Sequence, residues 1–177
     1  MSVKRENYTD LINYVANKSS VSYYRAGKIL STLCKKVQEA CFQGKDIDIE
    51  GLIFIEYTTS KYHIYENIIY GIEQQIEDVT KELNLPENEV MSVIYNYFKR
   101  IKELVETGYQ VNIKGIGYII PKEDSKGVYC DTRVSPVMKK PESAEFIVLN
   151  KDGIIETINI NGADLRFRVY LSDKIKI

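Results

Sequence analysis

The residues that could do chemistry in this chain are few and scattered. Its one histidine, His63, lies beside Tyr62, and its three cysteines are Cys34, Cys41 and Cys130. A Cys–His pair that attacks a substrate needs an activated thiol beside the imidazole, and none of these cysteines lies in a nucleophile-like turn. One histidine and three dispersed cysteines also lack the ligand spacing of a zinc site. We therefore expect no catalytic or metal-binding residues, and a structural role for His63.

The segment Gly115-Ile116-Gly117 could begin a dinucleotide-binding fingerprint, in which three glycines lie between a strand and a helix. Here the third glycine is missing, and the segment lies inside a predicted hairpin. We expect a turn at this point and no bound cofactor.

Two groups of side chains are candidates for contacts with a partner. The basic group lies in the C-terminal third of the chain and consists of Lys122, Lys126, Arg133, Lys139, Lys140, Arg166 and Arg168. The aromatic group consists of Tyr23, Tyr24, Tyr57, Tyr62 and Tyr65. Tyrosine gives a large contact area at low entropic cost, which suits protein interfaces.

Charge bears on which partner these groups would meet. Stacking on single-stranded bases would need interleaved Lys or Arg, whereas Glu56, Glu66 and Glu73 flank the tyrosines. This favours a protein interface over nucleic acid, and plain packing of the linker remains an alternative. Around Lys139-Lys140 and Arg133, a solvated loop, docking onto an acidic partner and phosphate contacts all remain open.

The whole chain is nearly neutral. It has 177 residues, with 24 Lys and Arg against 25 Asp and Glu, so its formal net charge is −1. Proteins that coat DNA usually carry a clear basic excess, so only a local patch could attract phosphate here. Neither a signal peptide nor a membrane span is evident, which predicts a soluble protein made in a cytoplasm, with no membrane partner.

The elements that must position these residues occur twice. Residues Leu11 to Glu56 align without a gap with Gln75 to Ile120, at an offset of 64 residues. The alignment keeps helical phase and then strand phase, and it pairs Gly44 with Gly108. Such a repeat predicts two copies of one small α+β fold.

In the first copy, Thr9 or Asp10 is expected to cap a helix that runs to about Lys18. Ser22 is expected to cap a second helix, which ends at Gly44. Alternating residues then predict two strands, residues 46–50 and 53–57, with Gly51 in the turn between them.

In the second copy we expect a longer helix from about Asn67 to Asn84, and Pro86 in the first turn of the next helix. A hairpin follows over residues 110–120, and Pro121 either terminates the pairing or places it at an edge. The boundaries we predict are residues 1–64 and 65–121 for the two copies, 122–144 for a long loop or an extended β-arm, and 145–177 for a β-rich extension. Strands are expected over residues 146–149, 154–160 and 165–171.

Two segments carry a resemblance to a known family. Asp10-Leu11-Ile12-Asn13, followed by Val15-Ala16 and Lys18, resembles the opening helix of the bacterial histone-like HU and integration host factor (IHF) family. Residues 108–118 resemble the glycine-containing hairpin of that family. The resemblance implies that the tandem pair imitates, within one chain, the intertwined dimer that this family forms.

The departures fall on the DNA-binding parts. Family members bind DNA through two basic β-arms, each with an Arg-Asn-Pro segment whose proline wedges between bases. No Arg-Asn-Pro occurs here, and in the first copy Tyr57 is expected to run through residues 58–61 straight to the next helix. In the second copy, Glu123, Asp124 and Asp131 lie among the basic residues of the expected arm.

Variants of this fold without the DNA-binding arm resemble the IHF-like structural proteins of crAss-like tailed phages, which are thought to build rings at the head-to-tail junction and along the tail. The resemblance implies a non-enzymatic ring subunit of a virion, assembled in the host cytoplasm, with copies of itself and neighbouring virion proteins as partners and no cofactor. The alternative is an architectural or regulatory DNA-binding protein of the HU and IHF type in the bacterial cytoplasm, although the charge balance disfavours DNA.

Overall fold

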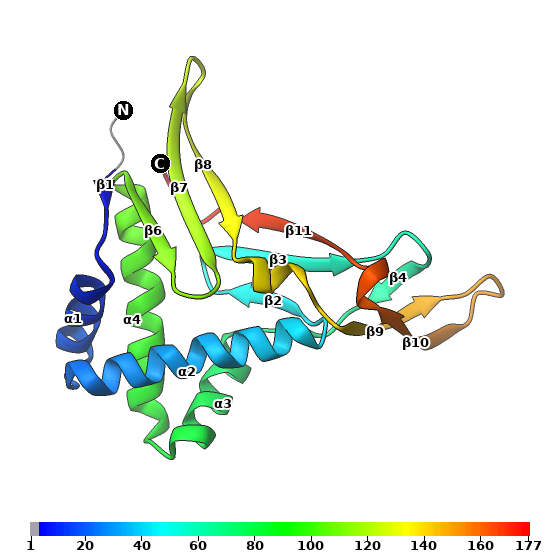
Figure 1. Ribbon diagram of the computed structural model, residues 1–177, viewed down its shortest axis with the longest axis horizontal. Helices are drawn as coiled ribbons and strands as arrows, with labels where there is room; N and C mark the ends of the chain where they lie inside the picture. The colour runs from blue at the N-terminus through cyan, green and yellow to red at the C-terminus, as the bar shows by residue number, and fades with distance from the viewer. Residues whose placement is uncertain (1–3) are drawn as a thin grey trace.

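The computed structural model describes residues 4–177, which form a mixed α/β protein of the expected α+β class (Figure 1). Over this range there are four α-helices and eleven strands in three sheets. The helices lie together at one side, and two strand hairpins project from the sheets in different directions. Among the described residues, none of the helices combines the length and the apolar character that a membrane crossing requires.

The helices are α1 (Tyr8–Ser19), α2 (Tyr23–Phe42), α3 (Ile72–Leu83) and α4 (Glu87–Glu106). Ser22 caps α2 as predicted, because its hydroxyl accepts a hydrogen bond from the Arg25 N–H. The predicted cap of α1 was wrong: the side chain of Asn7 accepts from the Thr9 N–H at 2.7 Å, so this helix begins earlier.

The strands are β1 (Lys4–Arg5), β2 (Asp46–Ile49), β3 (Ile53–Thr58), β4 (His63–Glu66), β5 (Ile69–Tyr70), β6 (Tyr109–Ile113), β7 (Gly117–Asp124), β8 (Gly127–Val134), β9 (Ser143–Leu149), β10 (Ile155–Asn161) and β11 (Arg166–Leu171). Two short 3₁₀ turns, η1 (Pro136–Lys139) and η2 (Gly162–Asp164), connect the later strands. The predicted start of α3 at Asn67 was wrong, because Ile69–Tyr70 pair with β2 before the helix begins.

The backbone repeats at the offset seen in the sequence. Helices α1 and α3, and likewise α2 and α4, begin and end 64 residues apart. The short helix of each copy ends at a non-glycine residue in the left-handed region, Ser20 with φ 55° and Asn84 with φ 51°. The glycines after the long helices repeat too: φ is 74° at Gly44 and 93° at Gly108. These left-handed positions let the chain reverse at equivalent places in both copies.

The two copies exchange strands. In one sheet β1 pairs with β6, with Arg5 opposite Gln110, and in another β5 pairs with β2, with Ile69 opposite Asp46. These are the same pair of positions with the copies interchanged, as an isologous contact about a two-fold axis requires. The buried side chains of both copies form a single hydrophobic cluster. Neither copy therefore completes its own core.

A salt bridge links equivalent positions of the two long helices. Arg25 Nη1 lies 2.9 Å from Glu89 Oε1, and these residues are 64 positions apart. Residues at equivalent positions meet only close to the axis that relates the copies. This pair therefore places the pseudo-two-fold axis between the first turns of α2 and α4.

The two copies differ most beyond their shared hairpins. In the second copy β7 runs through Pro121 and pairs with β8 down to Asp124, so Pro121 does not end the strand. The register of β7 with β6 extends only to Ile119, so Pro121 lies where β7 pairs on one side only, the edge position that proline tolerates. Residues 117–134 form a projecting arm, and η1 occupies part of the rest of the segment expected to be a loop or an arm.

In the first copy the prediction of a direct run from Tyr57 to the next helix was wrong, because β4 and β5 intervene. Here β11 pairs with β3, with Leu171 opposite Ile53. The position equivalent to Ile53 in the second copy is Gly117, and there Val134 of β8 lies opposite it. Strand β11 thus takes the place along β3 that an arm strand takes along β7. Strand β4 is left to pair with β9, in a three-stranded sheet of order β10-β9-β4.

The paired glycines provide a matched test of this packing. Both Gly44→Ala and Gly108→Ala place an L-residue at positive φ, which costs roughly 1–2 kcal/mol. A Cβ at Gly44 would also lie 2.7 Å from Ala144 Cα, whereas nothing lies within 4 Å of one at Gly108. We expect Gly44→Ala to lower the free energy of unfolding, measured in urea, by about 1–3 kcal/mol more than Gly108→Ala does, because of this overpacking. Equal losses for the two variants would contradict the close contact between Gly44, just beyond α2, and β9.

Candidate functional site

Two of the three basic residues of the arm, Lys122 and Arg133, lie beside a single carboxylate of the same arm, that of Asp131. Lys122 Nζ lies 3.1 Å from Asp131 Oδ2, and Arg133 Nε lies 3.8 Å from the same oxygen. These cations hold the pKa of the Asp131 carboxyl below its ordinary value, chiefly through the Lys122 hydrogen bond. Lys126 lies in the turn at the tip, where its N–H donates to Asp124. The arm therefore carries charges of both signs.

The remaining basic residues lie away from the arm tip. The Nζ of Lys139 lies 5.7 Å from the centre of the Phe167 ring, and Lys140 is exposed beyond the end of η1. Arg166 and Arg168 lie on the exposed side of β11, where Arg168 is opposite Glu56 of β3. The seven candidate cations are thus divided between the arm and the first copy, and several face acidic side chains.

The solvent-facing side of the first copy's hairpin carries acids. Asp48 and Glu56 occupy the positions that Asn112 and Ile120 occupy in the second copy, and the register of the two hairpins is the same. A surface built to hold a duplex would present positive charge on both sides of its axis. The charge on this face is mixed, because Arg168 of β11 lies opposite Glu56.

The five candidate tyrosines do not form one cluster. Tyr57 was wrongly expected at an interface: its side chain is only 2% exposed, and its hydroxyl donates to the Met138 carbonyl oxygen at 2.6 Å. Burial raises the pKa of this hydroxyl. The other four are exposed, and they divide into Tyr23 and Tyr24 at the start of α2 and Tyr62 and Tyr65 around β4.

The first tyrosine pair borders an open hollow of about 390 Å³ between α1 and α2. Its lining also includes Tyr8, Lys28 and Lys114, and Lys114 Nζ lies 4.3 Å from the centre of the Tyr8 ring. The hollow therefore places basic side chains beside aromatic rings, an arrangement that the tyrosines around β4, with Glu66 beside them, do not share.

His63 and the cysteines lie apart. His63 is exposed on β4 opposite Leu149, whereas Cys41 is buried and lies 2.7 Å from the Tyr57 hydroxyl. Among residues 4–177, no group of three or more His, Cys, Asp or Glu side chains is arranged to hold a metal ion.

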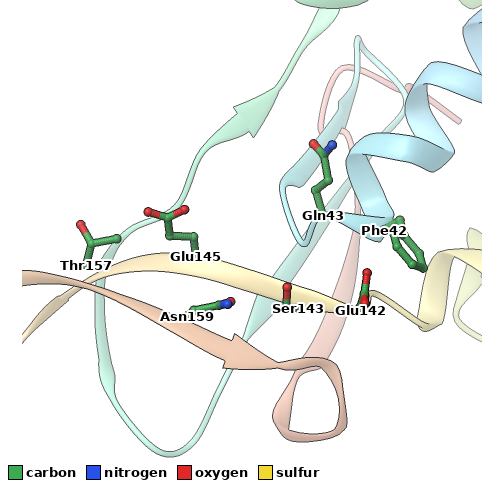
Figure 2. A pocket seen from close by; sticks show the side chains of 7 residues that line it. All are labelled: Phe42, Gln43, Glu142, Ser143, Glu145, Thr157 and Asn159. Atoms are coloured by element: carbon green, nitrogen blue, oxygen red, sulfur yellow. The ribbon is translucent and has the colours of Figure 1, made fainter.

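A second hollow, of about 460 Å³, lies between the end of α2 and the β9–β10 hairpin (Figure 2). Phe42 and Gln43 form one wall, and the side chains of Glu145, Thr157 and Asn159 rise from the sheet that forms the floor. Sequence reasoning missed this feature, because it depends on how the C-terminal hairpin docks onto α2. One hydrogen bond joins the two distant segments: the Glu142 N–H donates to the Phe42 carbonyl oxygen at 2.9 Å.

Asp46 is a buried carboxylate that fastens the linker between the copies. Its Oδ1 accepts hydrogen bonds from the Tyr57 N–H at 2.9 Å and from the Asn67 side chain at 2.8 Å, and the same Asn67 amide also donates to the Gly44 carbonyl oxygen. Burial raises the pKa of Asp46, and these two hydrogen bonds partly oppose that rise. The arrangement explains why Asn67 is a strand-entry residue and not a helix residue.

No protein-family model matches the chain, and no curated protein matches it.

The linker contact gives a pH-dependent prediction. Since the pKa of Asp46 is raised in the folded state, this carboxyl binds more proton in the native than in the unfolded protein between about pH 3.8 and its folded pKa, and its contribution to stability is lost as the pH rises through that window. Asp46→Asn keeps an oxygen acceptor and removes the charge, so we expect it to reduce this loss. Asp46→Ala leaves two donors unpaired and should cost about 1–3 kcal/mol.

Urea unfolding from pH 4 to pH 8 would measure both effects, with Asp152→Asn in the exposed β9–β10 turn as the control. If Asp46→Asn lowered the free energy of unfolding at pH 7 as much as Asp46→Ala does, the result would contradict this account.

Proposed function

We propose that this protein is a non-enzymatic structural assembly protein, a ring subunit of a tailed-phage virion, built on a duplicated HU/IHF-like fold. Its partners are other copies of itself and neighbouring virion proteins. The observation that carries the proposal is the combination of a strand-exchanged core with a mixed-charge outer face.

The exchange of strands supports the duplication of a dimeric fold. The pairs Arg5–Gln110 and Asp46–Ile69 hold each copy's entry strand against the other copy's hairpin. An intertwined dimer of two separate chains would have the same reciprocal contacts. Fusing the copies fixes one partner for each, so the two outer surfaces are free to differ.

The differences between the copies support a role in protein assembly. In the first copy β11 occupies the edge that an arm strand would use, and Asp48 and Glu56 lie on the face beside it. Exposed apolar side chains lie on several outer elements, namely Tyr118, Tyr129, Tyr170, Ile154 and Ile155. Tyrosine is enriched at protein–protein interfaces, and three of these five side chains are tyrosines.

A second candidate is an architectural or regulatory DNA-binding protein. The projecting β7–β8 arm favours it, because Lys122, Lys126 and Arg133 lie along a ribbon that could enter a groove. The carboxylate of Asp131 beside two of these cations weakens the phosphate attraction.

Native mass measurement is the direct test of the assembly role. The protomer has a mass of 20.4 kDa, and we expect a closed oligomer whose mass is a whole multiple of it, stable in moderate salt. Negative-stain images of the same sample should show rings. A monomer at every concentration that binds duplex DNA tightly would contradict the proposal.

A gel-shift titration at two salt concentrations separates the candidates. A DNA-binding protein would lose about one log unit of affinity per log unit of salt for each phosphate neutralised. Replacing Lys122, Lys126 and Arg133 by Gln would then reduce that slope by about one unit for each phosphate that the protein no longer binds. We expect weak binding and no such change, with Lys151→Gln in the β9–β10 turn as the matched control.

A further inference from the structure

The two edges of the β10-β9-β4 sheet differ in how well they are protected. Strand β4 forms one edge with only four residues, and its pairing with β9 shifts between Ile64 and Glu66. Short, irregular edge strands resist pairing with another chain. Strand β10 forms the other edge, and its seven residues pair with β9 without a shift. Within residues 4–177, no further strand pairs with β10.

The hydrogen-bond pattern identifies which groups of β10 face outward. The Asn150 N–H donates to the Ile154 carbonyl oxygen, and the Gly162 N–H donates to the Glu142 carbonyl oxygen. Because the bonded pairs of an antiparallel ladder alternate, the even-numbered residues between these points face β9. The backbone groups of Ile155, Thr157, Asn159 and Asn161 therefore point to the open edge.

These open-edge positions carry none of the usual protective devices. Strand β10 contains no proline and no lysine, and its one charged residue, Glu156, has its backbone turned toward β9. Ile155 is 52% exposed, and Ile154 beside it in the hairpin turn is 59% exposed. A long, regular edge with neutral outward residues is a template for a further strand.

We propose that β10 pairs antiparallel with β10 of a second copy of this chain, about a two-fold axis at Ile158. In this register Thr157 lies opposite the partner's Asn159, and Ile155 lies opposite the partner's Asn161, so every outward residue meets an outward residue. Ile158 meets its own equivalent, and Glu156 meets the partner's Ile160, so no like charges are opposed. The result is a continuous six-stranded sheet across the two copies.

The self-complementarity of the strand is the reason that the occupant is a second copy. The two outward residues next to Ile158, Thr157 and Asn159, are both polar, and the outer pair joins the apolar Ile155 to the polar Asn161. Both of these side chains lie over the hollow beside α2 (Figure 2), so pairing would join the hollows of the two copies along one sheet face. The inference does not require the ring proposal, because the same edge would be open in a DNA-binding protein.

Cross-linking tests the register. In Ile158→Cys the two introduced thiols would occupy a non-hydrogen-bonded pair, where the Cα atoms are about 4.5 Å apart, within the range of a disulfide. Mild oxidation with diamide should give a covalent dimer. In Glu156→Cys, the matched control, the thiols would lie opposite Ile160 and not opposite each other, so no dimer above the wild-type level is expected. Equal yields for the two variants would overturn the register.

A backbone substitution tests the edge itself. Thr157→Pro removes an outward N–H and leaves the β9 ladder intact, whereas Thr157→Val keeps that N–H with a similar shape. In analytical ultracentrifugation we expect self-association at least about tenfold weaker for the proline variant, because two symmetric hydrogen bonds are removed per dimer, and no change for the valine variant. Circular dichroism would verify the fold of each.

The outcomes distinguish this inference from the ring proposal. An oligomer of unchanged mass in Thr157→Pro would overturn the pairing of β10 and leave ring assembly standing. A wild-type protein that forms only dimers, and loses them in Thr157→Pro, would support the pairing and contradict the ring. If Thr157→Pro misfolds, the comparison of Ile158→Cys with Glu156→Cys decides the pairing.

Discussion

The reciprocal exchange of strands between the copies is the constraint on which the rest of the structure depends. Strand β1 must reach β6 across the molecule, and β5 must reach β2, before either sheet is complete. The linker therefore has a fixed path, and Asp46 fastens it by accepting hydrogen bonds from β3 and from Asn67. Because the buried side chains form one cluster, a substitution that disturbs the packing of one copy also destabilises the other.

Fusion of the copies also permits asymmetry, which a dimer of identical chains does not allow. The second copy has a projecting two-stranded arm, β7 and β8, whereas in the first copy the equivalent edge of β3 pairs with β11. The displaced strand β4 then becomes part of a sheet that the other copy lacks. The two copies of the pseudo-symmetric body therefore present different outer surfaces.

Local signals in the sequence predicted the repeated part of the fold well. Gly44 and Gly51 mark real reversals with positive φ, and the alternating residues of the hairpins pair in the register that their spacing indicates. The errors came from contacts between distant segments. Nothing near Asn67 indicates that it bonds to Asp46, and the pairing of β4 with β9 joins residues more than 80 positions apart. The prediction of candidate site residues failed for the same reason. Tyr57 was predicted to lie at an interface, but its hydroxyl donates to the carbonyl oxygen of Met138, which is distant in the sequence.

The position of β11 has a consequence for how the protein is made. The sheet of the first copy, with order β11-β3-β2-β5, remains incomplete until residues 166–171 have left the ribosome. A long sequence separation between partners slows folding, because the entropy of closing the loop is lost before the contact forms. During synthesis the edge of β3 therefore stays unpaired until this last strand of the sheet has been made.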